Sequence, residues 1–413
     1  MIETRDYDIS ELGDKKKIIP GPEPVLNRSG QVVPVCTPTL EGNEVEYVKE
    51  AVESSWISSR GKFLDDFEKL FAEKVGAKYA IAVNSGTSAL HLALAALGVG
   101  PGDEVIVPNA TMVSTAFAVS YLGAKPVFVD CDEYYQIDPS QIREVITSKT
   151  KCILPVHIYG HPVDCDEIEA FGLPVIYDAA ESHGALYKKR PIGGRGVASC
   201  YSFYGNKIIT TGEGGMITTN DEEFAKVARN LKDVAFSKVR HFWHTRLGYN
   251  FRMTNMQAAI GLAQTERFDE LVKARIDNAK YYMDRLTDLP LRLPKEADWA
   301  TNVYWMFGFE VEPEFGMTRD ELRIFMADRG IETRTFFVPM HLQPYYYKHQ
   351  DNFVWKNYSD TEASLRVDAS FPISERLCER GMYIPSSSNL TTEEMDLVIS
   401  AIKDAFQSRS WSV

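Results

Sequence analysis

Short apolar runs alternate with segments of helical periodicity along the first two thirds of the chain. The runs are rich in valine and isoleucine, and successive positions within each run are apolar. Continuous runs of this kind are typical of strands that are buried on both faces of a mostly parallel sheet. The predicted strands are 79–83, 104–108, 126–130, 152–156, 174–177 and 199–204. The predicted helices between them are 87–97, 113–122 and 139–146. This order predicts an α/β fold.

Two helices are predicted before the first strand. Val45, Val48 and Val52 recur at helical spacing, and Phe63 and Phe67 do so in the next segment. A loop over 56–61, with an exposed-looking tryptophan at its start, separates them.

A second unit follows a long helical stretch over 255–286. Its predicted elements are a strand at 303–311, a helix at 318–329, a strand at 331–335 and a final helix at 391–406. We therefore predict a smaller α+β domain beside the large sheet domain. The predicted division is an N-terminal extension 1–33, a large domain 34–270 and a small C-terminal domain 271–413.

Composition narrows the class of protein. The chain has 413 residues, 44% of them hydrophobic and 25% charged, which is typical of a soluble globular protein. A net charge of -13 argues against a nucleic-acid partner and against an anionic membrane surface. The six cysteines form no CxxC pair, and the N-terminus carries no signal peptide, so we expect a cytoplasmic protein without a membrane span. The eight dispersed histidines predict no metal site.

One lysine stands in a polar, glycine-rich turn between two apolar runs. Lys207 ends the segment Ser202–Lys207, and Gly212–Gly215 follows closely. A desolvated amine forms Schiff bases with carbonyl compounds, and burial lowers its pKa. Most lysines are solvated surface charges, so this position needs support from other motifs.

Two upstream motifs give that support. Ser85–Ser88 lies where a strand ends and a helix begins, and a helix N-terminus binds phosphate. Asp178 ends an apolar run, where it can hold the protonated nitrogen of a pyridine ring. The alternative for each motif is an ordinary helix cap. Together with Lys207 they supply what pyridoxal phosphate (PLP) needs. The glycines at 98–102 precede a strand, which excludes a dinucleotide fingerprint there.

Several motifs occur together in one known family. They are Trp56–Ser59, Asn84–Leu90, Pro155–Gly160, Asp178–Glu181, Gly205–Gly215 and Gly248–Asn255. With them the chain, from about Val33 to Ala405, resembles the PLP-dependent nucleotide-sugar aminotransferases of the DegT/DnrJ/EryC1/StrS family. The resemblance implies the type I aminotransferase fold (aspartate aminotransferase-like).

The resemblance also implies roles for individual residues. Lys207 is the catalytic lysine, Asp178 the partner of the ring nitrogen, and Asn250 the asparagine that reaches the cofactor phosphate of a neighbouring subunit, which implies a homodimer. Met112 stands where members usually stack an aromatic ring on the cofactor. The implied cofactor-binding residues are Ser85, Gly86, Thr87, Ser88, Met112, Asp178, Ala180, Glu181, Ser202, Asn206, Lys207 and Asn250.

Substrate contacts follow from loops that resemble the sugar-nucleotide groove of the family. The predicted residues are Trp56, Ser58, Arg60, His183, Arg240, Trp243 and His341. Arg60, Lys62 or Arg240 would pair with a diphosphate. The alternative for each is a surface charge, and for His341 a structural histidine.

The implied reaction moves the amino group of glutamate to C4 of a nucleotide-linked 4-keto-6-deoxy sugar, with the pyridoxamine form of the cofactor as carrier. The members most similar in these motifs make GDP-perosamine from GDP-4-keto-6-deoxymannose, for O-antigen or other lipopolysaccharide glycans. UDP- or dTDP-linked sugars, or C3, remain alternatives. A pyridoxamine-dependent dehydratase would carry histidine in place of Lys207, and a PLP-binding regulator would not need the intact motifs.

Overall fold

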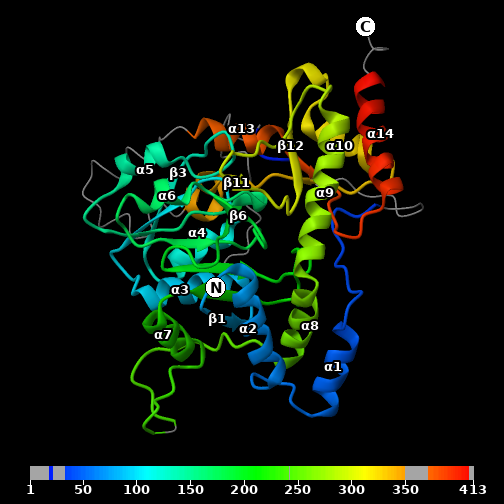
Figure 1. Cartoon of the computed structure of the whole chain (residues 1–413). Helices are drawn as coiled ribbons and strands as arrows, with labels where there is room; N and C mark the ends of the chain where they lie inside the picture. The colour runs from blue at the N-terminus through cyan, green and yellow to red at the C-terminus, as the bar shows by residue number, and fades with distance from the viewer. Residues whose placement is uncertain (1–17, 22–32, 241, 349–370, 409–413) are drawn as a thin grey trace.

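A computed structural model gives the fold and describes residues 18–21, 33–240, 242–348 and 371–408 (Figure 1). Most of the predicted extension 1–33 therefore lies outside the described residues. Of its described part, the Ile18 carbonyl accepts a hydrogen bond from the Cys378 thiol, and the Gly21 N–H donates to Asp320. No helix within these ranges is long and apolar enough to cross a membrane.

Seven strands make the large sheet, in the order β1-β9-β8-β5-β4-β2-β3. Parallel bridges from Ile153 to Val175 and from Val156 to Asp178 join its two halves. Only β9 runs antiparallel to its neighbours among these strands, so the prediction of a mostly parallel sheet is confirmed. The strands are β1 Tyr79–Val83, β2 Glu104–Pro108, β3 Lys125–Val129, β4 Thr150–Ile153, β5 Ile176–Asp178, β8 Ala198–Ser202 and β9 Gly215–Thr219.

Both faces of this sheet are buried. In β1, Ala80 and Ala82 belong to one apolar core and Ile81 and Val83 to another, because successive side chains of a strand point to opposite faces. This explains why the strands read as continuous apolar runs. The helices of the large unit are α1 Glu44–Glu53, α2 Lys62–Val75, α3 Gly86–Leu97, α4 Val113–Tyr121, α5 Pro139–Val145, α6 Cys165–Glu169, α7 Glu222–Lys232 and α8 Asn255–Glu266.

The prediction of one continuous helix over 255–286 is wrong, because the structure has two helices there. The chain leaves helical geometry at Arg267, whose φ is -98° and ψ 13°, so α8 ends there and α9, Phe268–Leu286, begins as a separate helix. The predicted domain boundary at residue 270 falls inside α9 and stays a prediction.

A second, antiparallel sheet has the order β10-β12-β14-β13 and packs with α9, α10 and α14 around its own core. Its strands are β10 Leu291–Arg292, β12 Phe307–Val311, β13 Arg334–Thr335 and β14 Gly381–Ile384. The helices are α10 Arg319–Ala327, α11 Pro344–Lys348, α13 Pro372–Arg380 and α14 Thr392–Ser408. Residues 303–306, predicted as strand, precede β12 as irregular chain.

Smaller elements join these units. A three-stranded sheet contains β6 Leu186–Tyr187, β7 Arg190–Pro191 and β11 Ala300–Thr301. Short 3-10 helices cover Ile158–Gly160, Pro313–Phe315 and Met340–Leu342. The ends of β5 and β8 and the start of α3 meet at one edge of the large sheet, where Ser202 lies against Gly86.

Candidate active site

The three motifs singled out in the sequence border one cavity of about 390 Å³. Of the predicted cofactor-binding residues, those that line it are Ser85, Gly86, Thr87, Met112, Asp178, Ala180, Glu181, Ser202, Asn206 and Lys207. Residues that are far apart in the sequence thus meet at the carboxyl edge of the sheet. This edge is where open α/β folds bind their ligands.

The start of α3 forms one end of the cavity. Ser85 caps the helix, since its Oγ accepts a hydrogen bond from the Ser88 N–H at 3.0 Å, so the cap alternative also holds. Gly86 is required by space, because a Cβ there would lie 2.7 Å from Ser202 Cβ. The Thr87 hydroxyl donates to Ser114 Oγ at 3.0 Å. Backbone N–H groups of this first turn and a close glycine suit a phosphate group.

Asp178 is buried at the end of β5. Its Oδ2 accepts a hydrogen bond from the Thr115 hydroxyl at 2.8 Å, and its Oδ1 accepts one from the Ala180 N–H at 3.1 Å. Burial raises the pKa of Asp178, and these two donors, with Lys207, oppose that rise. No helix begins at Ala179, so the helix-cap alternative for Asp178 is wrong. These contacts fix the carboxylate in an orientation in which it can accept a hydrogen bond from a protonated ring nitrogen.

The Lys207 amine is also buried. Burial lowers the pKa of Lys207, and the carboxylate of Glu181, with Oε1 at 3.4 Å from Nζ, opposes that shift. Glu181 is itself fixed, because its Oε2 accepts the Tyr159 N–H at 2.7 Å. The predicted desolvation of this lysine is therefore confirmed, and it favours the neutral, nucleophilic amine.

Aromatic side chains from the C-terminal third cover the cavity, and the sequence analysis did not single them out. They are Trp305, Phe337 and Tyr383. Trp305 lies with its ring centroid 3.5 Å from Lys207 Nζ. Each belongs to an apolar stretch of the small unit that reads as ordinary core, so no local signal marks it as part of a site.

Met112 lines the cavity at the start of α4 and remains 47% exposed. The position predicted for ring stacking is thus occupied by a partly exposed thioether. Its role toward the cofactor stays a prediction.

Two predicted substrate residues are corrected by the structure. His183 is fully buried among Phe71, Tyr201 and Phe203, where burial lowers its pKa to about 3. It does not line the cavity and so contacts no substrate there.

His341 does not line the cavity either. Its Nδ1 lies 3.1 Å from Asn109 Oδ1 and its Nε2 lies 3.1 Å from Glu375 Oε1. These contacts link the loop after β2 to α13. The alternative of a structural histidine is therefore the better description of His341.

The remaining predicted contacts lie outside the cavity of a single chain. Trp56, Ser58, Arg240, Trp243 and Asn250 are all exposed. Backbone groups of Trp56 and Ser58 bind Asn255, which fixes that loop. Arg240 and Trp243 belong to the loop between α7 and α8, which projects from the body of the molecule below α7 (Figure 1).

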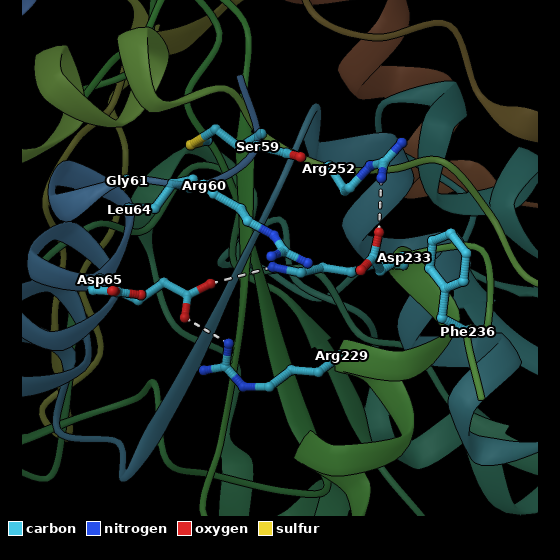
Figure 2. Close-up of a pocket in the computed structure, with 12 residues that line it drawn as sticks. Ser59, Arg60, Gly61, Leu64, Asp65, Arg229, Asp233, Phe236 and Arg252 are labelled. Atoms are coloured by element: carbon cyan, nitrogen blue, oxygen red, sulfur yellow. Dashed lines mark hydrogen bonds and ion pairs between the residues drawn. The ribbon is translucent and has the colours of Figure 1, made fainter. Parts of the chain in front are cut away.

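Arg60 lines a second pocket of about 420 Å³ and points into it (Figure 2). Glu68 pairs with Arg229 at 2.6 Å and with Lys232 at 3.3 Å, and Asp233 pairs with Arg252 at 2.8 Å. Arg60 forms no ion pair with any residue that the structure describes. The Asn250 side chain lies beside this pocket, since its Oδ1 accepts a hydrogen bond from Arg252 Nε.

Three features of the cavity suit PLP. Gly86 leaves room that a side chain would fill, and Asp178 offers a buried carboxylate. The buried Asn206 Oδ1, which also borders the cavity, has no hydrogen-bond partner among the described residues. Such an orphaned acceptor indicates space for a polar ligand.

Comparison with known proteins agrees with this geometry. The profile of the DegT/DnrJ/EryC1/StrS aminotransferase family matches residues 38–403. A protein of Caulobacter vibrioides named GDP-perosamine synthase is 43% identical over 377 residues, 90% of this chain and 97% of that protein. One of the same name from Escherichia coli O157:H7 is 40% identical over 383 residues, 91% and 99% of the two chains.

Solved structures of aminotransferases superpose over most of the chain. DesV of S. venezuelae has a TM-score of 0.78 and 33% identity, covering 88% of this chain and 94% of its own. An aminotransferase from Psychrobacter cryohalolentis has a TM-score of 0.81 and 32% identity, covering 92% and 99%. The predicted fold, the PLP dependence and the enzymatic class are confirmed, since this family comprises PLP-dependent sugar aminotransferases. The chain belongs to the DegT/DnrJ/EryC1/StrS aminotransferase family.

Proposed function

We propose that this enzyme transfers the amino group of glutamate to C4 of GDP-4-keto-6-deoxymannose, giving GDP-perosamine for a surface polysaccharide. Three relatives named GDP-perosamine synthase are 38–43% identical over 97–99% of their own lengths, and this carries the proposal. Glutamate leaves as 2-oxoglutarate, and the oxygen of the keto group leaves as water. A cytoplasmic location stays a prediction.

Residues at the two ends of the cavity would hold the cofactor. The start of α3, with Ser85 and Thr87, would take its phosphate together with Ser202, because N–H groups and hydroxyls gather there. Ser88 does not line the cavity, and its N–H and hydroxyl both bind Ser85 Oγ, so its predicted role as a phosphate ligand stays a prediction. Asp178 would keep a proton on the ring nitrogen. When bound, PLP supplies the electron sink that makes loss of a proton from the amine-bearing carbon feasible.

Lys207 would move the proton between carbon atoms. Burial lowers the pKa of this amine, so more of it is in the neutral form that can accept a proton, and Glu181 at 3.4 Å stabilises the ammonium that results. The aromatic cover excludes water from this exchange, since Trp305 and Tyr383 are both buried.

We further propose a homodimer in which Asn250 of each copy reaches the cofactor phosphate of the other. The loop between α7 and α8 exposes Val239 at 97% and Phe242 at 75%, together with Trp243 and Leu247. Exposed apolar groups of this size are typical of protein interfaces. In the same assembly, Arg60 and Arg240 would approach the diphosphate of the substrate, with Trp56, Ser58 and Trp243 beside it.

The decisive experiment compares wild type with Lys207→Ala in an assay for 2-oxoglutarate and amino sugar. Wild type should aminate GDP-4-keto-6-deoxymannose, and the variant should lose about 10²–10⁴-fold in rate or more. A variant as active as wild type would contradict the proposal. Faster turnover of a UDP- or dTDP-linked keto sugar would retain the aminotransferase and replace the nucleotide.

A further inference from the structure

We propose that Trp305 is a positioning residue for Lys207, and that its indole face holds the free lysine ammonium while its N–H fixes the turn that carries the lysine. The inference rests on the proposed function only in taking Lys207 as the reacting amine. No motif in the sequence points to Trp305, which lies outside the three segments that carry the chemistry.

The first observation is the position of the amine over the ring. Lys207 Nζ lies 3.5 Å from the centroid of the Trp305 ring, and Trp305 is only 2% exposed. A cation over an indole face is attracted by the partial negative charge of the π face, which arises from the ring quadrupole, and the attraction is larger where water is excluded. The ring therefore stabilises the ammonium in a place where burial destabilises it.

The second observation is a hydrogen bond to the neighbouring residue. Trp305 Nε1 donates to the carbonyl oxygen of Asn206 at 2.8 Å, one residue before Lys207. The same indole thus contacts both the backbone that leads into the lysine and the amine at the end of its side chain. A ring that only filled the core would need neither contact.

Trp305 is itself held on both sides of its backbone. Its N–H donates to the Tyr159 carbonyl oxygen at 2.9 Å, and its carbonyl oxygen accepts a hydrogen bond from Arg275 Nη1 at 2.9 Å. Tyr159 is the residue whose N–H also binds Glu181. The indole and the carboxylate that face the amine are therefore anchored to the same short segment.

Other charged groups also act on this amine. Burial lowers the pKa of Lys207, and Glu181 leads the interactions that oppose the shift. Among the described residues, the titratable groups that interact electrostatically with the amine are Glu181, Asp178, Cys36 and His183, and Arg275 contacts Cys36. Tyr204, Glu213 and Tyr383 line the same cavity. Replacing Trp305 leaves every one of these groups in the chain. Loss of burial would raise the pKa of the amine and loss of the indole face would lower it, so the direction of the change separates the two effects.

The test uses the full-length enzyme loaded with added pyridoxamine phosphate, a form in which Lys207 is free and no turnover is required. Dilute acetic anhydride labels neutral amines, and mass spectrometry of the Lys207 peptide gives the labelling rate against pH. Trp305→Leu should lower the midpoint of that profile by about 0.5–1.5 pH units, because the ring no longer favours the ammonium. Trp305→Phe, which keeps an aromatic face, should shift it by less than half as much.

Trp299→Leu provides the matched control, since it removes an indole that packs on Tyr187 and Tyr134. It should leave the Lys207 profile unchanged. An unchanged or raised midpoint in Trp305→Leu overturns the proposal, and so does a Phe variant that shifts as far as the Leu variant. If the shift appears but no keto sugar is aminated by wild type, the positioning role stands and the proposed function fails.

Discussion

The two pockets of this enzyme use their charges differently. In the cofactor cavity Asp178 and Glu181 are buried and hydrogen-bonded: Asp178 by Thr115 and the Ala180 N–H, and Glu181 by the Tyr159 N–H. In the second pocket Arg60 is exposed and forms no ion pair with a described residue, although Glu68 and Asp233 pair with the other cations. Asp178 and Glu181 of the first pocket therefore find partners within one chain, whereas Arg60 of the second pocket has no ionic partner among the described residues.

The largest expected effect is a loss of kcat when Asp178 in the first pocket is replaced. Asp178→Asn keeps the shape and removes the negative charge, so kcat should fall by about 10²–10³-fold while the fold is retained. Steady-state kinetics and the visible absorbance of bound cofactor measure the two effects separately. Thr115→Val is the companion variant, because it removes only one donor to this carboxylate. Wild-type kcat in Asp178→Asn would contradict the assignment.

A second substitution tests whether the cofactor cavity can accommodate a side chain at position 86. An alanine Cβ at position 86 would lie 2.7 Å from Ser202 Cβ, so Gly86→Ala must displace one wall. Overpacking of this kind costs about 1–3 kcal/mol, and the dissociation constant of PLP should rise by roughly 10- to 100-fold. Gly100→Ala is the control, since nothing lies within 4 Å of a Cβ there. Equal affinities for the two variants would remove Gly86 from the phosphate site.

The second pocket should respond in binding and not in chemistry. If Arg60 binds the substrate's diphosphate as proposed, Arg60→Ala should raise KM for the nucleotide sugar about 10-fold with kcat little changed. KM for glutamate should stay constant, because glutamate carries no diphosphate. Lys69→Ala, which removes an exposed charge from α2, is the control. A fall in kcat without a change in KM would assign Arg60 to the first pocket.

The smallest expected effect is a gain in cofactor affinity at Met112. Met112→Tyr would place a ring at the position where the family usually stacks one, and aromatic contacts are worth about 0.5–1.5 kcal/mol. PLP affinity should rise about 2- to 10-fold, as measured by fluorescence titration of the cofactor-free chain. Met112→Leu keeps a similar volume without a ring and should give no gain. An equal gain from leucine would mean that packing volume, not stacking, limits affinity.

The sequence predicted well those features that depend on residues close together in the chain, such as the strands and the motifs at their ends. Strands buried on both faces read as continuous apolar runs, and Ser85, Asp178 and Lys207 each sit at the end of such a run, so the cavity followed from the fold. Trp305 could not be found this way, because its partner Lys207 lies in another unit of the chain. The break at Arg267 also depends on packing, since 255–286 keeps helical periodicity throughout.

The substrate role predicted for His183 is wrong for a related reason, whereas for His341 the structure favours the structural alternative. A histidine next to a catalytic motif reads as a ligand, and only the packing decides whether its ring faces a cavity or a core. His183 lies two residues after Glu181, yet its ring packs among Phe71, Tyr201 and Phe203. Proximity along the chain gave no information about which direction the ring takes.

The aromatic cover of the cavity has a consequence for the order of events during synthesis. Lys207 and the start of α3 leave the ribosome well before Trp305, Phe337 and Tyr383, which close the cavity from the small unit. A growing chain therefore has its reactive amine without the aromatic cover until residue 383 has been made. A chain that ended before Trp305 would hold Lys207 and the start of α3 without any of these three rings.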